Sequence, residues 1–167
     1  IDKLKNTKVI FKICDIRNKF QIENIFNSFK PQYLFHTAAY KHVPILEDNI
    51  IEAITNNFMS VVSLIDVAIK HNLGKFVYIS SDKAVRPTNF MGATKRFSEQ
   101  VLQALAQKEQ ITKFSIVRFG NVLGSSGSVV PLFRRQINSG GPVTVTHPEV
   151  TRYFMTVQEA AQLVIQA

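Results

Sequence analysis

The chain has 167 residues, of which 46% are hydrophobic and 19% charged, and it carries a formal net charge of +8. This composition is that of a globular chain long enough to bury an ordinary core, and it excludes an intrinsically disordered protein. The longest apolar runs are strand-sized, short of the ~18 residues that a bilayer span needs, and no signal peptide opens the sequence. We therefore expect one domain. Its single cysteine, Cys14, excludes an internal disulfide and is expected to be a packed thiol.

Positive charge is concentrated in the first third of the chain, at Lys3, Lys5, Lys8, Lys12, Arg17, Lys19 and Lys30. No recognised nucleic-acid motif and no aromatic-plus-basic sheet pattern accompanies this charge, so we expect no nucleic-acid partner. A solvated face, or attraction to an anionic substrate or an acidic lipid surface, accounts for the charge instead.

Apolar spacing predicts strands that alternate with helices along the chain. The predicted strands are 9–13, 33–35, 76–79, 114–117 and a short one at 143–145. The predicted helices are 20–29, 48–71, 91–108, 130–137 and 157–165, with Phe97, Val101 and Leu105 facing inward and Gly74 as a left-handed cap. Strands that alternate with helices of this length predict an α/β fold with a doubly wound parallel sheet.

Polar residues gather where the predicted strands end. Asp15 follows the first strand, residues 38–42 the second, residues 81–83 the third and residues 120–121 the fourth. Ligands of doubly wound sheets bind outside the carboxyl ends of the strands. Clustering of this kind is unusual for a purely structural sheet, so it predicts a ligand site at this edge.

Residues 76–96 are the most informative stretch. An apolar strand ends at Ser81, an acid and a base follow as Asp82 and Lys83, and Met91 and Lys95 stand four apart at the start of a helix. That spacing places Met91 and Lys95 on one helix face. This is the arrangement of a dehydrogenase active site with methionine in the place of its tyrosine. An Asp-Lys pair in a surface turn is the plainer reading, and its position after an apolar strand counts against it.

A glycine-rich dinucleotide loop does not appear in the sequence. The pattern G-x-G-x-x-G should follow the first strand of a dinucleotide-binding fold, whereas Gly120, Gly124 and Gly127 have other spacing and follow a late strand. Either the fold is a different one, or the chain is a fragment. We favour the fragment: residues 1–167 form a single, partial NAD(P)-binding Rossmann-like domain that lacks its first β-α-β unit and contains part of the substrate-binding region.

Five segments carry a resemblance to a known family: residues 36–44, 81–89, 91–96, 118–128 and 151–155. In this order they resemble the bacterial UDP-N-acetylglucosamine 4,6-dehydratases, extended short-chain dehydrogenase/reductases of polysaccharide, capsule, O-antigen and glycoprotein synthesis. The methionine form is similar to the long, membrane-anchored members. The resemblance implies a UDP-sugar substrate, NAD or NADP as cofactor, a homo-oligomer, and a cytoplasmic domain anchored at the inner membrane only through a region upstream of Ile1.

The resemblance also implies catalytic roles. A 4,6-dehydratase oxidises the sugar at C4, removes water across C5 and C6, and returns the hydride to C6, which requires a general base and a general acid. Lys83 would be the base at C5, and Asp82 the acid that protonates the C6 hydroxyl. Ser81 would bind the C4 oxygen, and Lys95 the nicotinamide ribose. The thioether of Met91 has no proton to exchange, so Asp82, Lys83 or a water must take the C4 proton; we favour Asp82.

Binding residues follow from the same resemblance. The implied cofactor-binding residues are Asp15, Ile16, Ala38, Ala39, Lys41, Asn57, Lys95 and Phe119. The implied substrate-binding residues are His42, Asn121 and Arg152, with Arg134 and Arg135 as alternatives to Arg152 for the diphosphate. No set of residues has metal-ligand spacing, so we predict no metal.

Two other functions fit the same fold. A sugar 4-epimerase or ketoreductase would need one redox step without elimination, and so no Asp-Lys pair after Ser81. A nucleotide-binding member without catalysis would explain the missing tyrosine, but not the presence of Ser81, Asp82, Lys83 and Lys95 together. On any of these readings we expect the isolated 167 residues to be inactive.

Overall fold

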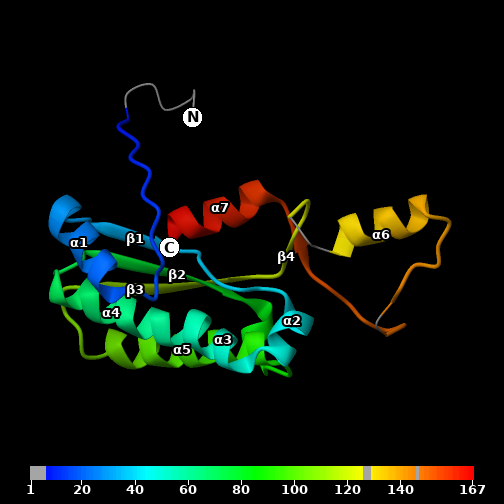
Figure 1. Ribbon diagram of the computed structural model, residues 1–167, viewed down its shortest axis with the longest axis horizontal. Coiled ribbons are helices and arrows are strands. Elements are labelled where there is room, and N and C mark those ends of the chain that lie inside the picture. The colour runs from blue at the N-terminus through cyan, green and yellow to red at the C-terminus, as the bar shows by residue number, and fades with distance from the viewer. Residues whose placement is uncertain (1–6, 126–128, 146) are drawn as a thin grey trace.

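The computed structural model describes residues 7–125, 129–145 and 147–167 (Figure 1). Lys3, Lys5 and Gly127, named above, lie outside this range. The helices are α1 Lys19–Phe29, α2 Val43–Asp48, α3 Ile50–Ile54, the π-helical turn η1 Thr55–Met59, α4 Ser60–Lys70, the 3₁₀ turn η2 Asp82–Ala84, α5 Phe90–Ala106, α6 Val129–Asn138 and α7 Val157–Gln166. The strands are β1 Tyr33–His36, β2 Lys75–Ser81, β3 Lys113–Phe119, β4 Asn121–Val122 and β5 Phe154–Met155.

Three parallel strands form the main sheet, in the order β1-β2-β3. Helices α4 and α5 cover one face of this sheet and α7 lies on the other (Figure 1). Parallel strands joined by helical crossovers with helices on both faces are a doubly wound arrangement. The predicted Rossmann-like α/β fold is confirmed. A second, two-stranded parallel sheet pairs β4 with β5.

The hydrophobic core lies between the sheet and helices α1, α4 and α5. Phe26 of α1, Ile65 of α4 and Phe76 of β2 are all at most 3% exposed. Full burial of side chains of this size stabilises the fold by about 1.5–3 kcal/mol each. Cys14 is half-buried and packs against the same cluster, in agreement with the expected packed thiol.

The helix that runs from Ile50 to Lys70, composed of α3, η1 and α4, is long and apolar enough to cross a membrane by length and composition. Its buried residues Val61, Leu64 and Ile65 belong to the hydrophobic core, as expected for the central helix of a globular domain. The predicted 48–71 helix is therefore confirmed in its main part. Helix α2, which precedes it and begins next to Pro44, was not predicted.

Two predicted strands are wrong. Residues 9–13 form no strand, and Phe11 and Ile13 are 76% and 106% exposed. A strand exists only when its backbone groups pair with a neighbour, and no strand of the described residues pairs with this segment. Residues 143–145 also form no strand; there the Gln136 side chain accepts from the Thr144 backbone N–H (3.1 Å) in place of a ladder partner.

Two smaller predictions are also corrected. The left-handed residue after α4 is Asn72 (φ 52°), not Gly74. Gly74 instead allows a close backbone approach, since a Cβ there would lie 3.0 Å from the carbonyl oxygen of Gln32. Phe97 does not face inward but is 56% exposed. On that side of α5 the helix faces solvent, and Ser98 and Glu99 occupy the buried face instead.

Candidate active site

Ser81, Asp82 and Lys83 form a connected group at the carboxyl end of β2. The Ser81 hydroxyl donates to Asp82 Oδ1 (3.0 Å), and Lys83 Nζ donates to the same oxygen (3.1 Å). The Asp82 and Lys83 side chains are each about a third exposed. A carboxylate and an ammonium in direct contact, partly shielded and open to ligand, can exchange a proton with each other and with a bound molecule.

Local structure holds this group in place. The Ser81 side chain accepts from the Lys83 backbone N–H (3.2 Å) and so caps the short turn η2. Asn89 caps α5 by accepting from Gly92 N (2.8 Å). Gly92 lets η2 lie against α5, because a Cβ there would be 2.3 Å from the Lys83 carbonyl oxygen. The turn and the helix start are therefore locked together at a position that only glycine permits.

Lys95 lies one helical turn after Met91 and is 7% exposed. Its Nζ donates to the carbonyl oxygen of Ile79 (2.8 Å) and lies 4.6 Å from the centre of the Tyr78 ring. Burial lowers the pKa of Lys95 to about 8, although the charge of Glu99 acts to raise it. The ammonium is thus held beneath the strand that ends in Ser81, on the helix face predicted from the four-residue spacing.

Met91 is 5% exposed and packs in a small apolar cluster with Leu46 of α2 and Ala53 of α3, against which Val43 also rests. Its predicted place on the face of Lys95 is confirmed, since both side chains are buried on α5. The surroundings of Met91 are apolar. The residue that stands where a dehydrogenase tyrosine is expected therefore joins α5 to α2 and α3.

Asn57 is 1% exposed, and both ends of its side-chain amide are engaged by the 38–42 loop. Its Oδ1 accepts from Tyr40 N (2.8 Å), and its Nδ2 donates to Tyr40 O (2.8 Å). It lies in the π-helical turn η1, a distortion that occurs frequently at functional sites. Because both polar atoms of its side chain bind the Tyr40 backbone, Asn57 can affect a ligand only by holding the 38–42 loop in place.

The loop that Asn57 holds lines a hollow of about 530 Å³ together with α2 and α3. Among the predicted binding residues, Ala39, Lys41 and His42 lie on its wall. Ala38 is exposed beside it. Within the described residues, the hollow and the Ser81–Lys83 group both follow the carboxyl ends of strands, β1 and β2 respectively.

Asp15 and Ile16 lie at the end of the extended segment that was predicted as a strand. The Arg17 guanidinium hydrogen-bonds the Asp15 carboxylate (2.8 Å from Nη2 to Oδ2) and lowers its pKa to about 2. Arg17 also reaches Glu52 of α3 (3.3 Å), a residue on the wall of the hollow. Asp15 is therefore connected to the hollow through Arg17.

Phe119 and Asn121 lie at the carboxyl end of β3. Phe119 is paired in register with Ser81, and Asn121 N donates to the Tyr153 carbonyl oxygen (2.9 Å) where β4 meets β5. Gly120 between them is required, because a Cβ would lie 2.6 Å from that same oxygen.

The pairing of β4 with β5 brings Arg152 to the same end of the molecule. Its exposed guanidinium donates to the Thr151 carbonyl oxygen (2.8 Å), while the alternatives Arg134 and Arg135 lie on α6, which buries none of its described residues.

A buried polar layer beneath the site was not predicted. It contains His36, Tyr78 and Glu99, at 4%, 0% and 0% exposed. Arg118, whose side chain is about a third exposed, pairs with Glu99 from the edge of this layer. Burial lowers the pKa of His36 to about 4, with a further contribution from Lys95. Glu99 continues the four-residue spacing of Met91 and Lys95, and that spacing was the signal available in the sequence.

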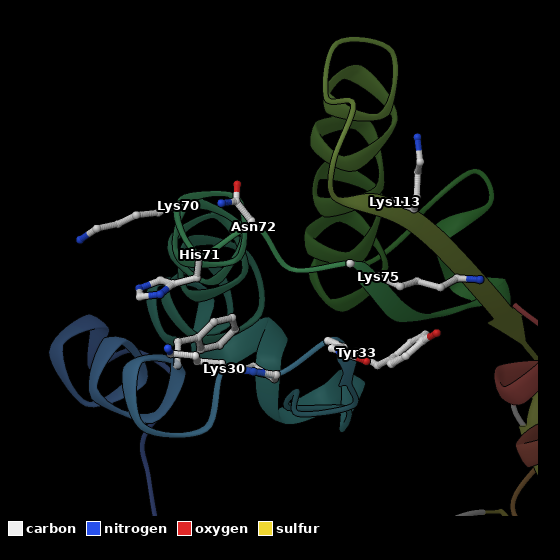
Figure 2. Close-up of a pocket in the computed structure, with 11 residues that line it drawn as sticks. Lys30, Tyr33, Lys70, His71, Asn72, Lys75 and Lys113 are labelled. Atoms are coloured by element: carbon white, nitrogen blue, oxygen red, sulfur yellow. The ribbon is translucent and has the colours of Figure 1, made fainter.

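A second hollow, of about 830 Å³, opens at the opposite, amino end of the sheet. Its lining includes Lys30, Lys70, Lys75 and Lys113, and it contains no acidic residue. Figure 2 shows that Lys70, Lys75 and Lys113 point in different directions and do not converge on the hollow. Lys70 is further engaged by Glu23 (2.9 Å). This hollow has the positive charge of an anion-binding site, but its lysine side chains do not point toward a common centre where an anion could bind.

The fold and the site together define a Rossmann-like protein with a Ser-Asp-Lys group at the carboxyl end of its central strand. The family model described as "Polysaccharide biosynthesis protein" matches residues 1–167. The chain belongs to this polysaccharide biosynthesis family.

Curated relatives agree with this assignment. The chain is 56% identical over 155 residues to the capsular polysaccharide biosynthesis protein CapD of Staphylococcus aureus, covering 93% of this chain and 26% of that protein. It is 38% identical to a UDP-glucose 4-epimerase of Rickettsia canadensis, covering 98% of this chain and 48% of the relative. The crystal structure of Pen from Bacillus thuringiensis superimposes with a TM-score of 0.88 at 38% identity, over 99% of this chain and 51% of Pen. The chain thus spans between 26% and 51% of these three proteins.

Among the residues that the structure describes, no group of three or more His, Cys, Asp or Glu side chains is arranged to hold a metal ion.

Proposed function

We propose that this chain provides the acid-base part of the active site of a nucleotide-sugar 4,6-dehydratase that acts on UDP-N-acetylglucosamine for capsule or related polysaccharide synthesis. The observation that carries the proposal is the contact of Ser81, Asp82 and Lys83 at the carboxyl end of β2. Elimination of water needs an acid and a base close together, whereas epimerisation or ketone reduction does not. The similarity to CapD, a capsular polysaccharide biosynthesis protein, supports a role of the proposed reaction in polysaccharide synthesis.

The residues present fit one side of a nicotinamide cofactor. The hollow beside the 38–42 loop is open and has both apolar and polar residues on its wall, among them Ile45, Leu46 and Lys41. Lys95 has an ammonium donor left beyond its bond to Ile79. NAD or NADP, when bound, takes up a hydride from the sugar and gives it back. We assign Ala38, Ala39, Lys41, Lys95 and Phe119 to this side of the site, with Asp15 and Ile16 toward the adenine and Asn57 as the support of the loop.

Proton movements would be carried by the three residues after β2. Ser81 donates to the C4 oxygen and orients it. Asp82 takes the proton of the C4 hydroxyl as the C4–H bond breaks, so that a ketone forms at C4. Lys83 then removes the proton at C5, which the ketone has made acidic, and Asp82 returns its proton to the C6 hydroxyl, which leaves as water. Lys83 would return its proton to C5 as C6 regains the hydride, which gives the 4-keto-6-deoxy sugar. Met91 takes no part in proton transfer, because a thioether has no proton to exchange.

Lys83 must lose its own proton to act as a base. Because Asp82 must stay free for the C4 proton, the Lys83 ammonium gives its proton to solvent before the sugar binds, through the third of its side chain that is exposed. His42 at the rim of the hollow, Asn121 after β3 and Arg152 before β5 are assigned to the sugar and the diphosphate. A guanidinium suits phosphate oxygens because it donates two parallel hydrogen bonds.

The Rickettsia relative favours a second candidate, a UDP-sugar 4-epimerase. Incubation of the full-length protein with UDP-N-acetylglucosamine and NAD separates the two. We expect a UDP-linked 4-keto-6-deoxy sugar whose mass is lower by one water. A product of unchanged mass would establish the epimerase and refute the dehydratase.

The full-length protein is further proposed to act as a homo-oligomer at the cytoplasmic face of the inner membrane, held there by segments outside this chain.

A further inference from the structure

The buried face of α5 continues beyond Lys95. Met91, Lys95 and Glu99 follow one another at four-residue steps, and Glu99 is 0% exposed. A carboxylate is almost never fully buried unless its charge is paired, because it loses its hydration. The reactions proposed above do not use Glu99. Its complete burial at this place therefore needs an explanation.

Two arginines pair with the Glu99 carboxylate. Arg118 donates from Nε to Oε1 (2.7 Å) and from Nη2 to Oε2 (2.5 Å), and Arg96 donates to Oε2 (3.2 Å). Burial by itself would raise the pKa of Glu99, but the hydrogen bonds from Arg118 and Arg96 outweigh it, so the carboxylate stays charged. A bidentate pair fixes relative orientation as well as distance.

The pair joins two parts of the proposed site. Glu99 lies one turn after Lys95 on α5, and Arg118 is the residue before Phe119 on β3, in register with Ser80. The Glu99–Arg118 pair thus ties the helix that presents Lys95 to the strand end that presents Phe119. In the unsubstituted protein these two elements can shift relative to one another only if an ion pair with a fully buried carboxylate is broken.

Glu99 also acts on Lys95 through its charge. Burial favours the neutral amine of Lys95, and the negative charge of Glu99 opposes this effect. His36 of β1 and Tyr78 of β2 lie beside Lys95 as well, both neutral near pH 7 because of burial. The elements packed against α5 carry further ionisable groups: Glu47 and Asp48 on α2, Glu52 on α3, Asp66 and Lys70 on α4, Lys75 on β2, Asp82 and Lys83 on η2, and Lys113 and Arg118 on β3.

We propose that Glu99 is a positioning residue of this site: paired with Arg118, it fixes α5 against the carboxyl end of β3 and supplies the negative charge that keeps Lys95 an ammonium in a buried setting. The proposal rests on the proposed function only for the task of Lys95, which is to bind the nicotinamide ribose. A purely structural ion pair would hold the helix and strand together without changing the ionisation of Lys95.

The test is the ionisation of Lys95 in the full-length protein. Trace acetylation with acetic anhydride at a series of pH values, followed by peptide mass spectrometry, gives the pH midpoint at which the Lys95 amine becomes reactive, without substrate or cofactor. In the unsubstituted protein we expect a midpoint at about pH 8. Glu99→Gln should lower it by about one pH unit, because it removes the negative charge that acts to raise the pKa of Lys95, and a nearby opposite charge shifts a pKa by about one unit or more.

Three further variants make the result specific. Arg118→Gln should also lower the Lys95 midpoint, because without its bidentate partner burial raises the pKa of the Glu99 carboxyl and weakens its negative charge. This variant keeps the proposal testable if Glu99→Gln does not fold. Glu99→Asp, which retains the charge, should restore the midpoint. Glu109→Gln, the same change at a half-buried site beyond α5, should not alter it.

Equal midpoints for the unsubstituted protein and Glu99→Gln, or for the unsubstituted protein and Arg118→Gln if only that variant folds, would overturn the charge effect. The affinity for NAD, followed by fluorescence, should weaken above the same midpoints in each variant. Because acetylation reports Lys95 without any sugar, a failure of the dehydratase proposal shows up separately, as a missing 4-keto-6-deoxy product with the Lys95 midpoints still shifted.

Discussion

The two ends of the sheet carry lysines in two different roles. At the carboxyl end, Lys83 contacts Asp82 and Lys95 is buried beneath β2. At the amino end, Lys30 caps α1 and Lys70 ends α4, where positive charge offsets the partial negative charge of a helix C-terminus. The amino-end hollow is the larger one, about 830 Å³ against about 530 Å³. This difference between the two ends indicates that a candidate active site is marked by an acidic and a basic side chain in contact and partly buried. Neither the volume of a hollow nor the number of lysines around it marks such a site.

The largest expected effect comes from the Asp82–Lys83 pair. In the full-length protein, Lys83→Met should reduce kcat for dehydration by about 10³-fold, because a general base contributes about 10²- to 10⁴-fold. Asp82→Asn should abolish both water loss and hydride transfer from C4, measured as cofactor reduction by absorbance. The matched control is Lys113→Met at the amino-end hollow, which should leave kcat unchanged.

Two outcomes would contradict this contrast. If Asp82→Asn still oxidised the sugar at C4, Asp82 would not be the C4 base, and a water or Lys83 would have to take that proton. If Lys113→Met lost as much activity as Lys83→Met, the amino end of the sheet would have a catalytic role.

Asn57 gives the next largest effect, because it holds the loop of the carboxyl-end hollow by two hydrogen bonds of 2.8 Å. Asn57→Ala leaves the Tyr40 N–H and C=O without partners and should destabilise the fold by about 2–3 kcal/mol. It should also raise the Kd for NAD, measured by fluorescence. Asn72→Gly at the amino end retains a left-handed position that glycine tolerates and should change stability by less than about 0.5 kcal/mol. Similar losses of stability in Asn57→Ala and Asn72→Gly would refute the idea that the carboxyl-end loop depends on Asn57 more than the amino end depends on Asn72.

His36, at the carboxyl end of β1, predicts a pH-dependent loss of stability. Its pKa is about 4 in the fold and 6.5 without the fold's influence, so the unfolded chain binds the extra proton first as the pH falls. Stability should therefore be lost between pH 6.5 and pH 4, by about 2 kcal/mol from pH 7 to pH 5. His36→Phe should flatten this dependence in urea unfolding measured at both pH values. An unaltered slope would show that His36 is not the titrating group.

Met91 gives the smallest expected effect. Its side chain packs against Leu46 and Ala53, so Met91→Leu keeps the volume and should cost less than about 1.5 kcal/mol of stability. The kcat should fall by less than about twofold, because no proton passes through this position. A loss of kcat comparable to that of Asp82→Asn would assign Met91 a direct part in the chemistry.

Local patterns in the sequence predicted much of the fold. Period-two and period-3.6 apolar spacing located β1, β2, β3, α1, α5, α6 and α7 within a few residues. The strand at 9–13 failed although its residues are β-branched and apolar, because a strand depends on a partner that composition does not reveal. Helix α2 was missed since its six residues are too few to show a helical period.

For the site, the sequence by itself determined which groups can carry the chemistry. Ser81, Asp82 and Lys83 are neighbours in the chain, and Met91 and Lys95 are one turn apart, so covalent connection and helix geometry place each set. Only the tertiary structure decided the burial, the neighbouring charges and the hydrogen-bond partners of those groups. The burial of Lys95, the pairing of Glu99 with Arg118 across 19 positions, and the hold of Asn57 on Tyr40 across 17 depend on packing between elements. Burial and the charges of distant neighbours set ionisation and position, and neither is encoded in any local stretch of the chain.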